Sequence, residues 1–161
     1  MTRVTFYTRR NCHLCDVAKE AVRGSGVPVD ITEIDIDTDA KLVKRYGNDV
    51  PIIVVDGVEA FRHRVKPDEF AAYVREGGRE QLNGAWKVVD EHHLERELRF
   101  PDFAQALAFT NAVGAIAEEQ QHHPDIYLTW GKVRIAVWTH DVDGLTRKDL
   151  DLAAKIDRIP V

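Results

Sequence analysis

The sequence lacks long apolar runs and an excess of basic residues, and both absences limit the classes of function that it can have. No apolar stretch approaches the ~20 residues that a membrane-spanning helix needs, and no apolar stretch with a cleavage site follows Met1. We therefore expect a cytoplasmic protein without a membrane partner. The formal net charge of −5 gives no broad attraction for phosphate groups, so we do not expect nucleic acid as a partner.

Cysteine is also scarce, because Cys12 and Cys15 are the only two cysteines in 161 residues. In a reducing compartment, a pair at this spacing indicates redox chemistry or metal binding rather than a structural disulfide. Apolar residues make up 44% of the chain and charged residues 30%, which is typical of a globular protein with a packed core. The length permits one domain or two small ones.

The first half of the chain alternates predicted strands and helices. The apolar patterns predict strands over residues 3–7, 31–36, 50–55 and 59–61, and helices over residues 13–23, 39–46 and 69–75. This order needs a central sheet that is covered by helices, which is the α/β class. Gly77 and Gly78 end the last of these helices, so we expect a first domain over residues 1–78.

The second half, over residues 79–161, has the pattern of an α+β domain. We expect strands near 86–89 and 94–100, a long helix over 101–121, a hairpin of strands 126–130 and 132–139, and a last helix over 146–157. Pro101 suits the first turn of the long helix. Apolar residues that include Phe103 and Leu107 follow helical spacing, which predicts that one face of this helix belongs to the core.

Five of the seven histidines lie in the second half, and three of them could meet. His122 and His123 precede Pro124 at the end of the long helix, and His140 ends a hairpin strand that returns towards them. Histidine transfers protons near neutral pH, so several imidazoles around one pocket could catalyse a dehydration.

Two other interpretations of clustered histidines exist. Adjacent histidines can be solvated loop residues, which we prefer for His92 and His93. Imidazole also binds zinc, but adjacent residues seldom both reach one ion, and a His-Glu-x-x-His pattern is absent from the sequence.

The order and spacing of these residues closely resemble the signature of the pterin-4a-carbinolamine dehydratases. The residues that carry the resemblance are Glu118, His122-His123-Pro124, Trp130, His140 and Asp149, with Trp86, the Phe100 to Phe109 segment and Gly144-Leu145-Thr146 as further matches. The resemblance extends from about Leu82 to Asp157.

This resemblance implies an α+β domain with a four-stranded antiparallel sheet and helices on one face, in a dimer or tetramer. It implies dehydration of a 4a-hydroxytetrahydropterin, such as 4a-hydroxytetrahydrobiopterin, to the quinonoid dihydropterin, without a metal or an organic cofactor. The residues to which it assigns acid, base or pterin-binding roles are His122, His123, His140 and Glu118, with Asp149 orienting an imidazole and Trp86 near the pterin ring. From the residues alone, Asp149 could equally be an acid that complements a helix dipole, and Trp86, Trp130 and Trp138 are core aromatics.

The two cysteines follow a predicted strand and open a predicted helix. Helix dipole and nearby Arg9 and Arg10 favour a thiolate at Cys12, which makes Cys12 the nucleophile and Cys15 the resolving thiol. A zinc site would need two more ligands, and the sequence has no second cysteine pair. A redox pair that exchanges with a thiol reductant or a disulfide partner is the better interpretation.

The segment from Val4 to Cys15, the Ile34 to Asp37 strand and Val50-Pro51 resemble a glutaredoxin-like member of the thioredoxin superfamily. The resemblance implies a thioredoxin-like fold in which Pro51 is cis and faces the disulfide. Asp49 stands where glutaredoxins have threonine, and the glutathione-binding Gly-Gly and acidic segment is absent after Gly57, so the resemblance does not extend to glutathione.

We therefore expect a dehydratase fused to a thiol-disulfide redox domain. One alternative is an interaction module, because the dehydratase family also provides, in animals, a dimerisation partner of a homeodomain transcription factor. Another is a thiol-disulfide oxidoreductase whose second domain only imposes oligomerisation. The presence of both His122 and His140 favours chemistry.

Overall fold

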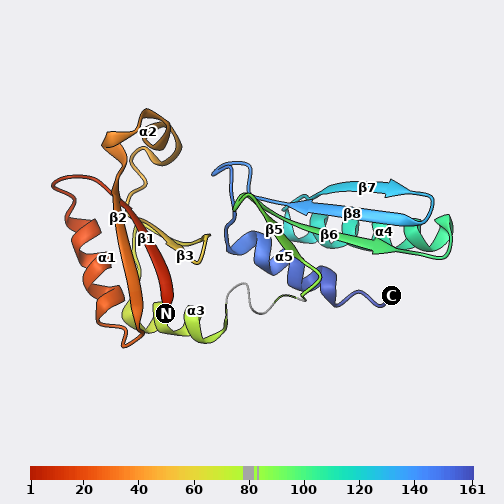
Figure 1. Ribbon diagram of the computed structural model, residues 1–161, viewed down its shortest axis with the longest axis horizontal. Coiled ribbons are helices and arrows are strands. Elements are labelled where there is room, and N and C mark those ends of the chain that lie inside the picture. The colour runs from red at the N-terminus through yellow and green to blue at the C-terminus, as the bar shows by residue number, and fades with distance from the viewer. Residues whose placement is uncertain (78–81, 83) are drawn as a thin grey trace. The chain divides into compact units, whose positions relative to one another are not determined.

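The computed structural model describes residues 1–77, 82 and 84–161, in two compact units, Met1–Gly78 and Arg79–Val161. Figure 1 shows the elements of each unit, which are described separately here. In the described residues, no helix is long and apolar enough to cross a membrane.

The first unit has a four-stranded mixed sheet in the order β2-β1-β3-β4. Strand β1 pairs in parallel with β2 and antiparallel with β3, which pairs antiparallel with β4. The elements in chain order are β1 (Thr2–Thr8), α1 (His13–Arg23), β2 (Val29–Asp35), the short 3-10 turn η1 (Ile36–Thr38), α2 (Ala40–Tyr46), β3 (Ile52–Val55), β4 (Val58–Arg62) and α3 (Pro67–Arg75). The expected α/β thioredoxin-like class of this domain is confirmed.

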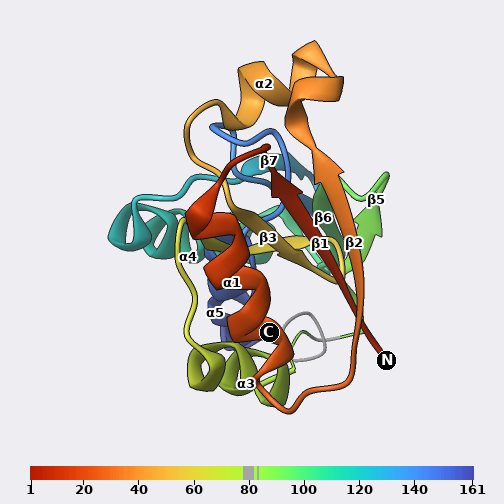
Figure 2. The same ribbon diagram turned by 90° about the vertical axis from the view of Figure 1, so that its left-hand side faces the viewer.

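The core of the first unit forms where α1 covers the sheet, as Figure 2 shows. Helix α1 buries Cys15, Ala18 and Val22 because these side chains recur at helical spacing. Ala18 and Val22 pack in one cluster with Phe6 of β1 and Phe70 of α3, neither of which is exposed to solvent. Burying each such aromatic side chain stabilises the fold by about 1.5–3 kcal/mol.

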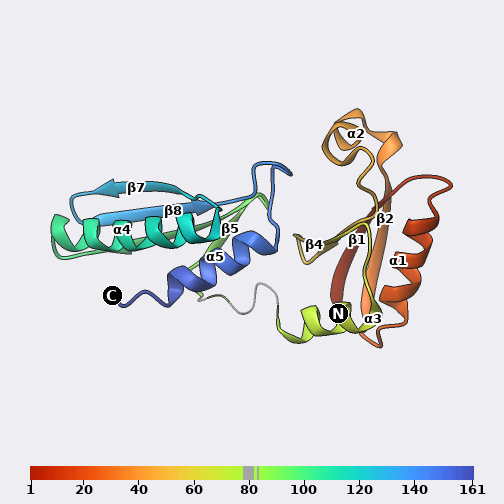
Figure 3. The ribbon, with the colours of Figure 1, turned by 180° about the vertical axis from the view of Figure 1, so that it is seen from behind.

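The second unit has a four-stranded antiparallel sheet in the order β5-β6-β8-β7. Its helices lie on one face of the sheet, in front of the strands in Figure 3. The elements are β5 (Lys87–Val89), β6 (His93–Arg99), α4 (Phe103–Gln120), β7 (Asp125–Thr129), β8 (Lys132–Val137) and α5 (Arg147–Asp157). The expected α+β class is confirmed.

The two faces of β8 have different neighbours. Val133, Ile135 and Val137 are fully buried on the helix side of the sheet. Since side chains alternate along an extended chain, Thr139 continues this face and Trp138 lies on the other. Beyond the strand, Thr139 and Gly144 exchange two backbone hydrogen bonds of 2.9 and 3.3 Å, which close a loop that carries His140.

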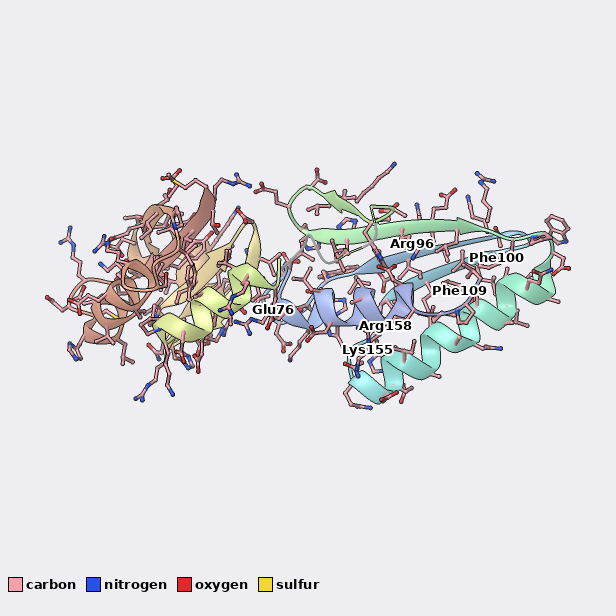
Figure 4. The ribbon with its side chains drawn as sticks, turned by 90° about the horizontal axis from the view of Figure 1, so that it is seen from below. Glu76, Arg96, Phe100, Phe109, Lys155 and Arg158 are labelled. Carbon is pink, nitrogen blue, oxygen red and sulfur yellow. A yellow bond between two sulfur atoms is a disulfide. The ribbon has the colours of Figure 1, made fainter. Side chains whose placement is uncertain are left out.

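Helix α4 differs from its predicted form in two respects. It begins at Phe103, because Asp102 caps it by accepting from the backbone N–H of Gln105 at 2.9 Å, so Pro101 precedes the helix instead of opening it. The buried stripe is narrower than expected, since Phe103 is 44% and Leu107 38% exposed. The residues that α4 does bury are Ala106, Phe109, Val113 and Ala117, and Phe109 packs on Phe100 at a ring distance of 5.3 Å (Figure 4).

Trp130 was expected in the core and is 70% exposed. It lies at the tip of the hairpin between β7 and β8. The expectation for Trp130 was therefore wrong.

Candidate active site

The end of α4 determines where the first histidine lies. Gln121 adopts a left-handed conformation with φ of 51°, and the backbone N–H of His122 donates to Ala117 at 3.1 Å. This is a common way for a helix to end. The chain then leaves the helix, and the His122 side chain is left 12% exposed.

His122 binds a carboxylate that is fully buried. Nε2 of His122 lies 2.6 Å from Oδ1 of Asp149, whose side chain has no exposed surface. The other oxygen, Oδ2, accepts from the hydroxyl of Thr139 and from the backbone N–H of Thr146, both at 2.8 Å. An ionised carboxylate only accepts hydrogen bonds, so Nε2 of His122 is the donor and Nδ1 is the nitrogen that can exchange a proton.

Asp149 is held by the local structure of α5. It is the third residue of the helix and forms a capping box with Thr146. The Thr139 and Thr146 hydroxyls also bond to each other at 2.8 Å. Such a satisfied buried network holds an imidazole in one orientation.

The second histidine pairs with the glutamate of the motif. Nε2 of His123 lies 2.8 Å from Oε1 of Glu118, and both side chains are more than half exposed. Glu118 belongs to the last turn of α4, so this pair lies beside the His122–Asp149 pair along the chain.

His140 joins these groups through its neighbour in the chain. Thr139 binds Asp149, and His140 follows it in the closed loop. The His140 ring packs edge-on against Trp138 at 4.6 Å. His140 is thus next in the chain to a residue of the Asp149 network, while its ring contacts Trp138, on the other side of the extended chain from Thr139.

Sequence reasoning missed a group of residues around Trp138. The His92 and His93 rings lie 5.4 and 5.9 Å from Trp138, and Nε2 of His92 lies 2.6 Å from Oδ1 of Asp143. His93 begins β6 and its side chain is 20% exposed, so the expectation of a solvated loop residue was wrong for His93, whereas His92 lies in the turn before β6 with its side chain 33% exposed. The antiparallel pairing of β6 and β8, which sequence alone does not reveal, pairs Leu94 with Val137 and so brings the neighbouring His93 and Trp138 together.

Trp86 contacts the C-terminal end of α5. Its Nε1 donates to Oδ1 of Asp157 at 2.7 Å, and Arg96 of β6, labelled in Figure 4, binds the same oxygen. Asp157 ends α5 eight residues after Asp149, which is about 12 Å along the helix. The structure therefore places the indole N–H of Trp86 at the opposite end of α5 from His122.

The two cysteines form a second candidate site, in the first unit. Cys12 and Cys15 are disulfide-bonded, and Sγ of Cys12 accepts from the backbone N–H of Cys15 at 3.1 Å as the cap of α1. Cys15 is 1% exposed, whereas Cys12 is partly exposed. Cys12 is thus the sulfur that a partner can reach.

Pro51 follows a cis peptide bond, as the glutaredoxin resemblance implies. Its neighbour Val50 packs in the same small core as Cys15. Asp49 binds Arg62 at 2.9 Å and His63 at 3.1 Å.

Arg9 is engaged by a carboxylate. It binds Asp37 at 2.8 Å and the carbonyl of Gly47 at 3.2 Å. The hydrogen bond between Arg9 and Asp37 lowers the pKa of Asp37 and raises the pKa of Arg9. Arg10 is exposed.

Across the described ranges, no three His, Cys, Asp or Glu side chains are grouped so that they could hold a metal ion.

Two family models match the chain. The model described as pterin 4 alpha carbinolamine dehydratase matches residues 64–159, and the model described as glutaredoxin-like domain matches residues 3–75. A protein of Alkaliphilus metalliredigens named "Putative pterin-4-alpha-carbinolamine dehydratase" is 47% identical over 91 residues, which are 56% of this chain and 78% of that protein. A protein of the same name in Rubrobacter xylanophilus is 58% identical over 79 residues, covering 49% of this chain and 73% of that protein.

A crystal structure from Brucella melitensis, described as transcriptional coactivator/pterin dehydratase, is 27% identical, with a TM-score of 0.45, and covers 58% of this chain and 95% of that chain. The family match includes every residue from His92 to Asp149 that forms the site above. Residues 3–75 form a glutaredoxin-like domain, and the chain belongs to the pterin-4a-carbinolamine dehydratase family.

Proposed function

We propose that the domain of residues 79–161 dehydrates a 4a-hydroxytetrahydropterin, with 4a-hydroxytetrahydrobiopterin as the expected substrate, to the quinonoid dihydropterin. The observation that supports this most is the His122 imidazole, fixed at 2.6 Å by the fully buried Asp149 in a chain of this family. An imidazole held in one orientation is what general acid–base catalysis requires.

Dehydration needs two proton transfers. The hydroxyl on carbon 4a leaves as water once it takes a proton, and a ring N–H loses one. In this proposal His122, His123 and His140 supply the acid and the base. Asp149 orients His122, and Glu118 orients His123. We assign Trp86 no contact with the pterin, because Trp86 is 8% exposed and its N–H is bound by Asp157 at the end of α5 opposite His122.

The experiment is the rate of dehydration of 4a-hydroxytetrahydropterin by the wild-type protein and by His122→Ala and His140→Ala variants. We expect each variant to lose about 10²–10⁴-fold, the usual contribution of a general acid or base. His13→Ala, an exposed histidine of the other domain, is the matched control and keeps the wild-type rate. If the folded wild-type protein does not accelerate the spontaneous reaction, the dehydratase proposal is wrong and an interaction module is favoured.

The second candidate function is thiol-disulfide exchange by the domain of residues 1–78. The partly exposed Cys12 and the buried Cys15 support it. A reducing cytoplasm would suit a pair that cycles between dithiol and disulfide. The test is mixed-disulfide formation by the wild-type and Cys12→Ser proteins. Equal amounts of mixed disulfide in the two would exclude this function.

We also propose that the chain forms a homodimer or homotetramer. The exposed Phe103 and Leu107 on α4 support this, because they provide an apolar strip that a second copy can cover. Oligomerisation would add to the dehydratase function without replacing it.

A further inference from the structure

We propose that the reduced Cys12–Cys15 pair transfers two electrons to the quinonoid dihydropterin and returns it to the tetrahydropterin. This inference rests on the proposed dehydratase function, because that reaction supplies the electron acceptor. It gives the two halves of the chain consecutive steps in one sequence of reactions.

The product of the proposed dehydration is an electron acceptor that suits a dithiol. Loss of hydroxide from carbon 4a and of a proton from a ring nitrogen leaves carbon 4a in a C=N bond, which is electrophilic. A thiolate is the nucleophilic form of cysteine, and two neighbouring thiols can deliver two electrons by closing a disulfide. The chain carries one such pair, and its proposed reaction makes one such electrophile.

The transfer balances in two steps. The Cys12 thiolate adds to carbon 4a, which forms a C–S bond, while the ring nitrogen of the former C=N bond takes a proton. The Cys15 thiolate then attacks Sγ of Cys12, so that the S–S bond forms and the C–S bond breaks. The electron pair of that bond stays on the pterin ring, which takes a second proton. The dithiol loses two electrons and two protons, and the pterin gains both.

The geometry of the disulfide assigns the two roles. Cys12 caps α1 and accepts the backbone N–H of Cys15 at 3.1 Å, so a thiolate at this position meets a hydrogen-bond donor and the positive end of a helix. Cys15 is 1% exposed and cannot meet a pterin, but it can attack the sulfur beside it. Cys12 is therefore the attacking thiol and Cys15 the resolving thiol.

The positive charges near the cysteine pair are engaged to different degrees. Arg9 is bound by Asp37, and Arg62 by two carboxylates, at 2.9 Å in the case of Asp49. Arg10, two residues before Cys12, is 92% exposed and lies 4.0 Å from Asp35.

The covalent connection keeps the dithiol and the proposed dehydratase site in one chain. Helix α3 ends at Arg75 and β5 begins at Lys87, so a short segment joins the two domains. Short tethers give effective concentrations on the order of millimolar. A dithiol tethered in this way can reduce the product without waiting for an encounter between two molecules.

A single-turnover experiment tests the proposal. The full-length protein is reduced, freed of reductant under anaerobic conditions, and mixed with an equal amount of 4a-hydroxytetrahydropterin. We expect one tetrahydropterin to form for each Cys12–Cys15 disulfide that closes. Cys12→Ser and Cys15→Ser proteins are expected to dehydrate the substrate at the wild-type rate and to form no tetrahydropterin. Cys15→Ser should instead retain a pterin adduct on Cys12 that mass spectrometry detects.

A second arm separates this proposal from the proposed function. Quinonoid dihydropterin, made by oxidising tetrahydropterin, is given directly to the reduced wild-type protein and to reduced His122→Ala. Both are expected to reduce it, because the step does not use His122. If both leave it to decay at the spontaneous rate, or if Cys12→Ser reduces it as fast as the wild type, the proposal is wrong even where dehydration is normal. Reduction in this arm without dehydration in the first would refute the dehydratase function alone.

Discussion

Nε2 of His122 lies 2.6 Å from Oδ1 of Asp149, and the carboxylate of Asp149 has no exposed surface. Three segments that are distant in the sequence meet at this carboxylate: the end of α4, the residue Thr139 after β8, and the start of α5. The imidazole is therefore oriented by the fold of the whole domain. Changes in the network should affect both the stability of the domain and its reaction.

Removing the Thr139 hydroxyl tests the buried network. Thr139→Val keeps the shape of the side chain but takes a 2.8 Å donor from Asp149, so we expect unfolding to become easier by about 1–3 kcal/mol and dehydration to slow. Urea unfolding and the dehydration rate measure the two effects. Thr129→Val, at an exposed strand position, is the control and should change stability by less than about 0.5 kcal/mol. Equal effects of the two substitutions would contradict the network.

Removing the Trp138 ring tests the support of His140. The two rings lie 4.6 Å apart, so Trp138→Ala should free the imidazole and lower the dehydration rate by about tenfold or more. The chemical shifts of the His140 ring protons should move towards solvent values in the same variant. Trp130→Ala removes an exposed indole at the far end of β8 and should leave both measurements unchanged. An unchanged rate in Trp138→Ala would exclude this support.

Tyr46 should make the first domain less stable as the pH becomes alkaline. Burial raises its pKa from 10.0 to about 12, because the phenolate is disfavoured away from water. The unfolded chain loses this proton first, so the stabilisation is complete below pH 10 and falls as the pH rises towards about 12. Urea unfolding between pH 9 and 11 should show a decline that Tyr46→Phe makes shallower. Parallel curves for the two proteins would refute this expectation.

The apolar strip on α4 should control assembly. Leu107→Glu introduces a charge at a position that is 38% exposed in one copy, and we expect the mass measured by light scattering to fall towards that of a monomer. Gln105→Glu adds the same charge on an exposed polar position of α4 and should leave the mass unchanged. If Leu107→Glu keeps the wild-type mass, the copies associate through another surface.

Local patterns in the sequence predicted most of the elements. The bounds of α1, residues 13–23, agree with the structure, because its start and its apolar spacing both depend on neighbouring residues. The end of β2 was less accurate, since Asp35 starts the turn η1 by accepting from the backbone N–H of Asp37. Boundaries set by a single side-chain hydrogen bond are hard to read from composition.

The parts of the site that sequence reasoning missed depend on contacts between distant segments. His92 and His93 meet Trp138 through the pairing of β6 with β8, and Asp143 reaches His92 across a closed loop. The exposure of Trp130 likewise depends on its place at the tip of the β7–β8 hairpin. The family resemblance gave Asp149 as a residue that orients an imidazole, whereas the identity of that imidazole as His122 and the complete burial of Asp149 needed the folded chain.

The central claim is that Asp149 acts through His122, and a double-mutant cycle on the dehydration rate tests it most directly. His122→Ala, Asp149→Asn and the double variant are compared with the wild type, and circular dichroism checks that each is folded. We expect each single variant to lose about 10²–10⁴-fold and the double variant to be no slower than His122→Ala alone. Losses that multiply in the double variant, or a wild-type rate in His122→Ala, would contradict the account.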